Sequence, residues 1–409
     1  MPKIQLDLYE TKEFFRKHGI DPYEKCPCGS GKKYKWCCKQ NTTPCKSSND
    51  IKRVYHNIKN EIWNRRNWKT MTCHWGKCCN DTQRCHSIQN NRFLSQICGI
   101  RKEVYHFIPK GTLGDERIEL QEEPISLAST FNGFCNIHDK ELFSIIEGSN
   151  DILYSIQQMY ALVYRNFYYM LLKKEISQSI IFKKSIRSTP RYYQKEYKPR
   201  NSQDAQIALE MLLDLRKNQV MHDELLDIVS DIESNYDENR HTWDIINNCM
   251  IFSIVRTLKV TNANFCFQTV REYLLKSEVV AQQNTATIDD YQIKRYDHIS
   301  TIVLPNVLNN EINVFFAISN RHKMGSPQDF IIHVNSCSDE EIIDILNNII
   351  IDAYEELYIS KNKMYDMVSP KLKKQVSDIL LKQTFYNNVP LLLDDIYKSP
   401  KVKVLQLRD

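Results

Sequence analysis

The chain has 409 residues, 26% of them charged, and 11 of its 14 cysteines precede residue 140. This length supports domains with their own hydrophobic cores, so disulfide cross-links are not needed to explain the cysteines. Residues 1–20 lack the apolar run of a secretory signal, and no long apolar stretch of membrane-spanning type occurs. These features argue against secretion and membrane insertion. They predict a cytoplasmic, reducing location, where clustered cysteines bind metal.

Charge is distributed unevenly. Residues 1–110 contain 22 Lys and Arg against 9 Asp and Glu, a net of +13, whereas residues 111–409 contain 33 against 41, a net of −8. A basic N-terminal head is typical of a surface that binds a polyanion, because each neutralised phosphate releases counterions. We therefore expect nucleic acid or a ribonucleoprotein to contact this head. The alternative is that the lysines only solvate small zinc modules.

The first cysteine cluster lies in the sequence CPCGSGKKYKWCC and consists of Cys26, Cys28, Cys37 and Cys38. Four thiolates closing on one ion form a tetrahedral, structural zinc site, and Gly29 and Gly31 permit the chain to reverse between the pairs. We expect so short a module to share little core with the rest of the protein, so that its loss leaves the body folded.

The spacing and the intervening residues resemble the SEC-C motif, a zinc module known from the SecA translocation ATPase and from many bacterial proteins. The resemblance implies a docking element. Charge and apolar surface for a protein partner would come from Lys32, Lys33, Tyr34, Lys35 and Trp36. The alternative is again that the lysines are merely solvated.

The second cluster is spread over a longer stretch that contains Cys73, Cys78, Cys79, Cys85, His86, Cys135 and His138. A treble-clef zinc finger takes two ligands from a knuckle and two from the first turn of a helix, and FCNIHDKELFSII opens an apparent helix with Cys-x-x-His spacing. The predicted zinc ligands are Cys73, one of Cys78 or Cys79, Cys135 and His138. The alternative is a set of buried free cysteines with unrelated roles.

A treble clef with these residues resembles the HNH nuclease family, which is built on that fold. The resemblance implies that His86 activates water, that Asn132 orients it, and that Asp139 helps to hold Mg²⁺ or another divalent ion at the scissile phosphate. Two features depart from the family pattern: Cys85 occupies the place of a second His or an Asp, and 48 residues separate His86 from Cys135. The rival function is a non-catalytic adaptor that docks a protein or ribonucleoprotein through the SEC-C module.

The remaining sequence predicts an α+β fold. Residues 152–170 predict one long helix whose tyrosines, Tyr160, Tyr164 and Tyr168, pack in a core or interface. A loop at 187–202 and two separate helices around 207–215 and 225–232 follow. Three or four mostly antiparallel strands are predicted from the β-branched runs 249–260, 298–305, 311–319 and 329–334, then helices at 338–359 and 369–383. The body histidines lack a nearby partner, and we expect them to be structural or exposed.

Together these patterns predict five segments: a SEC-C module at 1–40, a linker and helix at 41–70, a treble-clef-like domain at 71–150, a helical region at 151–240 and an α+β domain at 241–409. The predicted function is that of a two-zinc, nucleic-acid-associated bacterial protein, with HNH-like cleavage in defence or stress response as its candidate activity.

Overall fold

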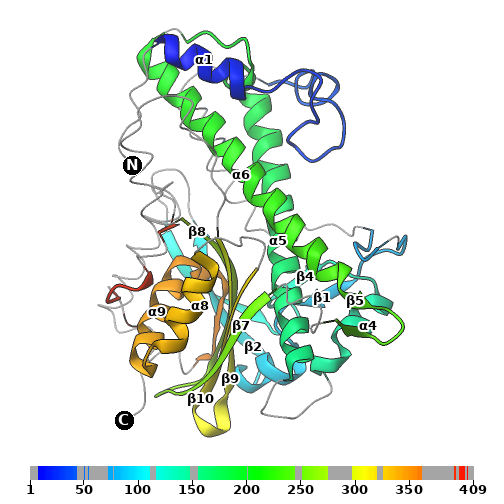
Figure 1. Ribbon diagram of the computed structural model, residues 1–409, viewed down its shortest axis with the longest axis vertical. Coiled ribbons are helices and arrows are strands. Elements are labelled where there is room, and N and C mark those ends of the chain that lie inside the picture. The colour runs from blue at the N-terminus through cyan, green and yellow to red at the C-terminus, as the bar shows by residue number, and fades with distance from the viewer. Residues whose placement is uncertain are drawn as a thin grey trace.

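The computed structural model confirms the α+β class and combines a mostly antiparallel sheet with long helices (Figure 1). The described residues are 8–43, 50, 54, 72–76, 78–110, 117–147, 155–199, 201–244, 251–274, 297–319, 326–361, 391–392, 396–400 and 403. The predicted helix at 369–383 and nearly all of the linker and helix predicted between 41 and 70 lie outside these residues.

An eight-stranded sheet forms the wide end of the molecule. Its order is β3-β2-β11-β8-β9-β10-β7, all antiparallel, and β12 pairs in parallel with β8. The strands are β2 (Glu103–Lys110), β3 (Arg117–Pro124), β7 (Ile251–Lys259), β8 (Phe265–Leu274), β9 (Asp297–Asn306), β10 (Glu311–Ser319), β11 (Leu357–Ile359) and β12 (Leu391–Leu392).

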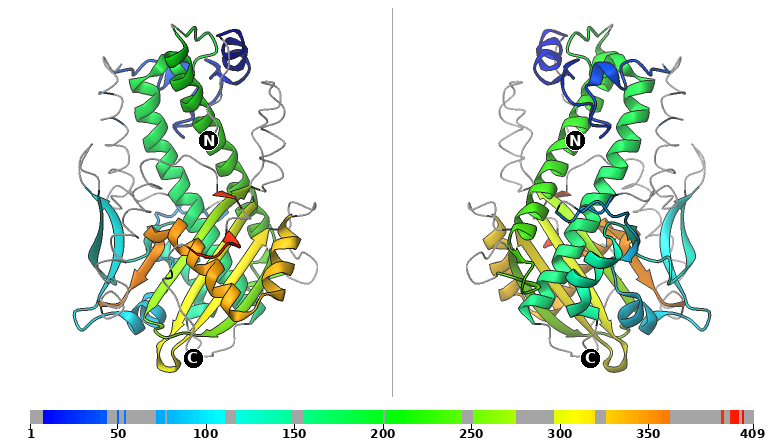
Figure 2. Two further views of the ribbon diagram at one scale, coloured as in Figure 1. Left: turned by 90° about the vertical axis from the view of Figure 1, so that its left-hand side faces the viewer. Right: turned by 90° about the vertical axis from the view of Figure 1, so that its right-hand side faces the viewer.

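The central strands divide their side chains between two hydrophobic cores, because successive residues of a strand point to opposite faces. On β10, Phe315 and Ala317 enter the core on the side of α5 (Ile156–Ser188). Val314 and Phe316 enter the core beneath α8 (Ser326–Ser336) and α9 (Asp339–Asp352). Figure 2 shows α8 (Ser326–Ser336) and α9 (Asp339–Asp352) on one face of the sheet and the long helices on the other.

The strand predictions are confirmed for three runs, which form β7, β9 and β10, and wrong for 329–334, which lies within α8. Phe330 and Val334, one helical turn apart, are fully buried, while Ile332 between them is 65% exposed. Burial on one stripe of a helix therefore outweighs the β propensity of these residues. The helix predicted at 338–359 is confirmed over Asp339–Asp352 as α9, which begins at a capping box formed by Ser338 and Glu341. The prediction is wrong for residues 357–359, which form β11 because they pair with β8 in the buried sheet.

Two helices of 33 residues each, α5 (Ile156–Ser188) and α6 (Ser202–Ser234), form a hairpin that rises from the sheet. The long helix and its buried tyrosines are confirmed by α5, where Tyr160, Tyr164 and Tyr168 are at most 4% exposed. The prediction of two helices after residue 202 is wrong, because the polar stretch between Leu215 and Leu225 contains no Gly or Pro and remains helical.

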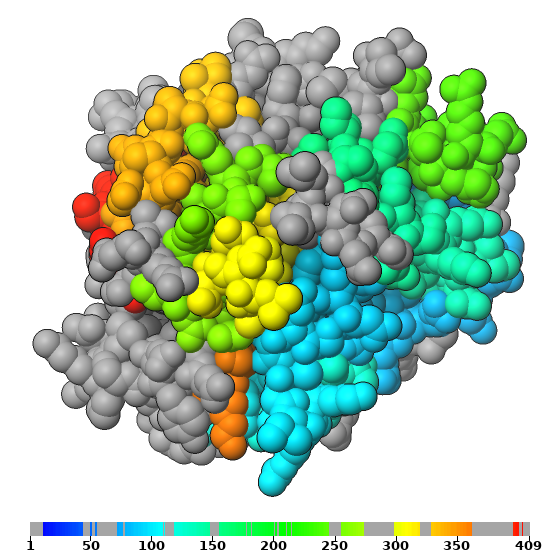
Figure 3. Space-filling view, turned by 90° about the horizontal axis from the view of Figure 1, so that it is seen from below, coloured from blue at the N-terminus to red at the C-terminus, as the bar shows by residue number. Residues whose placement is uncertain are grey.

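The remaining described elements are short, apart from α1 and α4. They are α1 (Leu8–His18), β1 (Arg84–His86), α3 (Ser95–Ile97), β4 (Thr130–Asn132), α4 (Asn136–Glu147), β5 (Tyr236–Asp237) and β6 (Thr242–Trp243). Short 3-10 helices occur at Tyr34–Trp36, Pro190–Tyr193, Val307–Asn309 and Tyr354–Glu356, and a π-helical turn at Asn90–Leu94. Seen from below in Figure 3, the β9–β10 turn lies beside the segment that precedes β2, where the Val307 backbone N–H donates to Gln96 Oε1 (3.3 Å).

Residues 8–43 cover the far end of the helical hairpin (Figure 1). A third, separate core lies there and joins Phe14 and Phe15 of α1 to the adjoining parts of α5 and α6. Within the described part of the chain, no helix has the length and apolarity needed to cross a membrane.

Candidate metal centres

The first metal centre consists of Cys26, Cys28, Cys37 and Cys38, whose sulfur atoms lie within 4.8 Å of one another. The Cys28 and Cys37 sulfurs are 3.5 Å apart, and those of Cys37 and Cys38 are 4.0 Å apart. Zinc–sulfur bonds of about 2.3 Å in a tetrahedron place the sulfurs about 3.8 Å apart, so this cluster fits one zinc ion with four protein ligands.

The turn between the two cysteine pairs has the conformation that its glycines predict. Gly29 and Gly31 have φ angles of 75° and 69°, in the left-handed region that L side chains disfavour. The backbone N–H of Cys26 donates to the Lys32 carbonyl (2.7 Å) and closes the loop. Hydrogen bonds from Cys26 and Cys38 lower the pKa of Cys28, so a thiolate that could bind zinc is favoured at this position.

The first centre is fixed firmly on the tip of the hairpin. Arg216 of α6 donates to the carbonyls of His18 (2.7 Å) and Gly19 (3.2 Å) and forms an ion pair with Glu24 (3.2 Å). All four cysteines belong to one core with α1 and with Phe182, Ile186, Leu209 and Leu212. The expectation that this module shares little core with the rest of the protein is therefore wrong: it shares the tip core, though not the two cores of the sheet.

An exposed patch of aromatic and basic side chains lies beside this centre. Lys35 Nζ is 3.9 Å from the centroid of the Tyr23 ring and 4.7 Å from that of Trp36. The two rings are 62% and 59% exposed. Lys32 and Lys33 are also exposed, whereas Tyr34, which the resemblance placed on the docking surface, is buried in the tip core.

The second metal centre consists of Cys73, Cys78, Cys135 and His138. His138 Nδ1 is 3.4 Å from the sulfurs of both Cys73 and Cys135, and the Cys78 and Cys135 sulfurs are 3.9 Å apart. These separations also fit a tetrahedral zinc ion. The structure brings Cys78 into the cluster, while Cys79 is exposed and does not belong to it.

The ligands of the second centre come from a loop and from the start of a helix. Cys73 and Cys78 lie on the loop before β1, β1 pairs with β4, and Cys135 and His138 lie at the start of α4. Burial raises the pKa of Cys135, but the backbone N–H groups of His138 and Ile137 at this helix start outweigh it, and the net shift is downward. A thiolate is thus favoured where the helix dipole is positive.

Two residues that the sequence did not single out hold the second centre in place. Trp75, within the knuckle, makes edge-to-face contacts with Tyr164 of α5 and Tyr236 of β5. The Asn80 side-chain amide approaches the Cys135 sulfur (4.0 Å). Trp75 and the ligands Cys73 and Cys135 belong to the core between the sheet and α5. A Trp inside a cysteine knuckle was the available signal for this anchoring.

The three candidate catalytic residues lie on β1, β4 and α4, around the second centre. His86 Nε2 donates to the Ile125 carbonyl (3.1 Å), and burial lowers the pKa of His86, so the ring is neutral at pH 7. Asn132 is opposite Arg84 in the β1–β4 pair. Burial raises the pKa of Cys85 to about 12, which makes it a neutral thiol.

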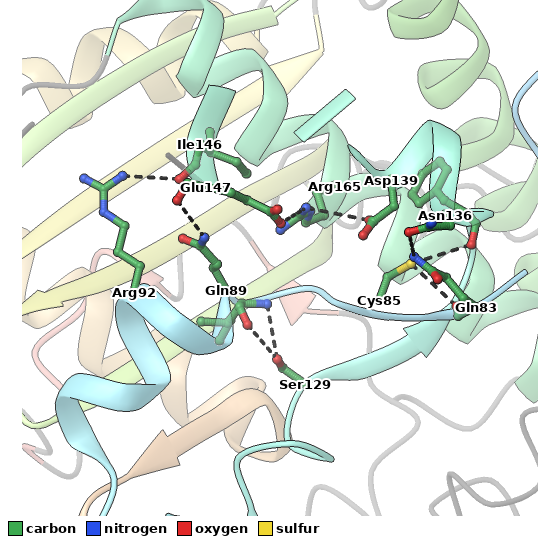
Figure 4. Close-up of polar contacts among 12 residues, drawn as sticks. Gln83, Cys85, Gln89, Arg92, Ser129, Asn136, Asp139, Ile146, Glu147 and Arg165 are labelled. Atoms are coloured by element: carbon green, nitrogen blue, oxygen red, sulfur yellow. Dashed lines mark hydrogen bonds and ion pairs between the residues drawn. The ribbon is translucent and has the colours of Figure 1, made fainter. Parts of the chain in front are cut away.

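Asp139 faces a cation that the protein itself provides (Figure 4). Arg165 of α5, only 1% exposed, lies 3.0 Å from Glu147 and 3.7 Å from Asp139, and its guanidinium is 4.0 Å from the centroid of the Phe143 ring. Among the described residues, no group of three or more donors whose atoms all lie within 4.8 Å of one another includes His86 or Asp139. Arg165 is the only charged residue between positions 156 and 172, and this was the available signal for a buried cation.

No family model, curated protein or solved structure matches this chain. The SEC-C and HNH resemblances therefore rest only on the residues quoted for them, and the geometry itself supports two cysteine-rich groups that could hold zinc.

Proposed function

We propose that this protein is a zinc-stabilised binding protein that uses the patch beside its first metal centre to contact nucleic acid or a ribonucleoprotein. The observation that carries the proposal is the arrangement of Tyr23, Lys35 and Trp36, in which two exposed rings flank one ammonium group. Exposed rings stack on bases and lysines contact phosphates, which is the combination that binds single-stranded nucleic acid.

The position of the patch supports the same function. It lies on a module that the hairpin carries away from the sheet (Figure 1). The first centre has four protein ligands and no open coordination position, so its zinc would shape the patch without taking part in chemistry. The zinc ion would then be needed for binding because it fixes the turn that carries Lys32 and Lys33.

A titration of fluorescent single-stranded RNA and DNA with the full chain tests the proposal. We expect the affinity to fall steeply between about 50 and 200 mM salt, and to fall at least tenfold in Trp36→Ala and in Lys35→Glu. The matched control is Lys259→Glu, at an exposed lysine at the end of β7. Binding that is absent, or is unchanged in both patch variants, would refute the nucleic-acid proposal and favour the adaptor that docks a protein through the SEC-C module.

HNH-like cleavage is a second candidate, and one observation favours it. His86, Asn132 and Asp139 lie on the two strands and the helix that surround the second centre, the arrangement on which the resemblance depends. A divalent ion such as Mg²⁺ would have to displace Arg165 from Asp139, because the carboxylate already faces that guanidinium. The binding proposal does not require such a rearrangement, and we prefer it for this reason.

His86→Ala separates the two candidates in a cleavage assay on DNA and RNA with Mg²⁺ present. A general base contributes about 10²–10⁴ in rate, so loss of cleavage with both zinc ions retained would establish catalysis. If His86 only donates to the Ile125 carbonyl, the substitution costs about 1–3 kcal/mol of stability and changes no activity. Asn132→Ala and Asp139→Ala should also abolish cleavage if the site is catalytic, and should leave activity unchanged if it is not.

A further inference from the structure

Three side chains from separate elements meet where the second metal centre contacts the helical hairpin. His74 belongs to the knuckle, Glu175 to α5 and His222 to α6. His222 Nε2 is 3.4 Å from Glu175 Oε1, and His74 Nε2 is 4.0 Å from Glu175 Oε2. One carboxylate therefore lies between two imidazole nitrogens, although the sequence predicted that His222 has no partner nearby.

We propose that His74, Glu175 and His222 form a third metal site, which takes a divalent first-row transition ion such as Zn²⁺, Co²⁺ or Ni²⁺. Two imidazoles and one carboxylate are donors that these ions prefer. Ligand atoms about 2.1 Å from one ion lie about 3.0–3.4 Å apart at the angles of octahedral and tetrahedral sites. The separation of 3.4 Å between His222 Nε2 and Glu175 Oε1 already has this value. His74 Nε2 lies 4.0 Å from the other carboxylate oxygen, Oε2, and the donor atoms of the three residues do not all lie within 4.8 Å of one another. Binding one ion therefore requires the His74 side chain to move toward Glu175 and His222.

Asp223 hydrogen-bonds to the ring nitrogen of His222 that does not face Glu175, as the partners of metal-binding histidines usually do. Its Oδ1 atom lies 3.0 Å from His222 Nδ1. A carboxylate on one ring nitrogen fixes the tautomer, so the other nitrogen keeps a free lone pair for an ion, and it makes that nitrogen more basic. Because Nδ1–H donates to Asp223, Nε2 is the nitrogen directed at Glu175. The pair on α6 therefore acts as a ligand and its orienting partner.

The surroundings attract a cation and leave it accessible. Burial lowers the pKa of His222, but the hydrogen bonds to Glu175 and Asp223 outweigh burial and the net shift is upward. The neighbouring Lys174 is directed away, toward Glu272 (3.2 Å). The side chains of His74, Glu175 and His222 are 37%, 28% and 20% exposed, so an ion can reach them from solvent.

This site differs from the two cysteine centres in how it would bind. The donor atoms of this site lie farther apart than those of the cysteine centres. Among the described residues, only the two cysteine groups have all their ligand atoms within 4.8 Å of one another. Three protein ligands leave coordination positions for water, so the ion should exchange readily and bind more weakly. His74 adjoins the ligand Cys73, and its backbone N–H points to the Gly133 carbonyl (3.5 Å), so the second centre helps to position it.

Titration calorimetry with Ni²⁺ tests the proposal, using the full chain without a polyhistidine tag and already holding its cysteine-bound zinc. We expect the wild-type protein to take up one Ni²⁺ per chain. His222→Gln and Glu175→Gln should abolish this uptake while metal analysis finds the zinc content unchanged. Asp223→Asn, at a side chain that is 75% exposed, should weaken binding about 10–100-fold because it removes the orienting carboxylate.

His241→Asn is the matched control, because His241 is exposed and lies outside the site. Asn tolerates the positive φ of 52° at that position, so the control should fold and bind Ni²⁺ like the wild type. Absence of Ni²⁺ uptake by the wild-type protein would overturn the proposal. So would full uptake by both His222→Gln and Glu175→Gln, which would show that these residues form an ion-pair bridge only.

Discussion

The two cysteine centres have similar donors but join different amounts of chain. The first centre closes within one short turn, between Cys26 and Cys38. The second links Cys73 to His138, which are 65 positions apart, and the intervening segment contains the β2–β3 hairpin of the large sheet. Because the cost of closing a loop grows with its length, an ion at the second centre would remove more conformational freedom from the unfolded chain than an ion at the first.

The hydrophobic cores that contain the two centres also differ, because the core of the second centre includes more of the chain. The first centre lies in the tip core with α1 and the adjoining parts of α5 and α6. In the second centre, Cys73 and Cys135 lie in the core that joins the sheet to α5, with Phe131, Tyr164 and Phe315 among its members. An ion at the first centre would therefore shape a surface, whereas an ion at the second would be required for the fold.

The largest effect is expected from Cys135→Ser, which removes a ligand of the second centre. Structural zinc contributes about 10 kcal/mol or more of apparent free energy in small zinc domains, which is comparable to the whole stability of an ordinary protein. We expect loss of the second ion and of cooperative unfolding, measured by metal analysis and by circular dichroism during heating. A variant that lacks this ion but unfolds like the wild type would make the two centres equivalent.

Cys37→Ser should produce a smaller and more local effect. The first ion should be lost, and backbone amides of α1 and of residues 182–186 and 208–215 should exchange faster, since these segments share the tip core. Amides of β8, β9 and β10 should keep their protection, because their side chains lie in other cores. Hydrogen exchange measured by mass spectrometry distinguishes the two regions. Faster exchange throughout the sheet would contradict the separation of the cores.

The sequence predicted both centres because their donors and spacing are a local chemical pattern. Cys26, Cys28, Cys37 and Cys38 are adjacent in sequence and in space, so little could intervene between pattern and site. The choice between Cys78 and Cys79 was left open, since either could follow the knuckle, and only tertiary packing decides it. Packing also determines the secondary structure of residues 329–334, whose sequence favours a strand but which lie within α8.

Contacts between distant segments could not be predicted. Arg165 pairs with Asp139 and Glu147, and His222 with Glu175, only because α5 packs against α4 and α6. Strand β8 escaped notice although it lies at the centre of the sheet, because its run FCFQTVREYL includes charged residues. Those charges have partners: Arg271 pairs with Glu355 and Glu272 with Lys174.

The Glu272–Lys174 pair is a link between β8 and α5 that does not depend on metal, and it gives a pH dependence. Burial raises the pKa of Glu272, but Lys174, with His298 and Arg271, lowers it to about 2. Since the folded pKa lies below the unfolded value of about 4.3, this stabilisation is present above about pH 4.3 and is lost as pH falls toward 2. We expect Glu272→Gln to be less stable than the wild type at pH 7. Its free energy of unfolding should fall less than that of the wild type as the pH is lowered.

Urea unfolding of the wild type and Glu272→Gln at each pH measures this contribution. Acid also protonates the cysteine ligands and releases zinc, but it does so in both proteins, so the difference between them reports Glu272 alone. A difference that stays constant from pH 7 to pH 3 would show that Glu272 is not held ionised by Lys174.

The smallest effect is expected from Cys79→Ser, beside the ligand Cys78. Cys79 is exposed and lies outside the cluster, whereas the Cys78 sulfur is 3.9 Å from that of Cys135. Cys79→Ser should therefore keep the second ion and the melting temperature of the wild type, while the matched Cys78→Ser should lose the ion and resemble Cys135→Ser. Metal analysis of the two proteins, prepared side by side, measures the contrast. The reverse result, with zinc lost from Cys79→Ser and retained by Cys78→Ser, would make Cys79 the ligand instead of Cys78 and overturn the assignment of the second centre.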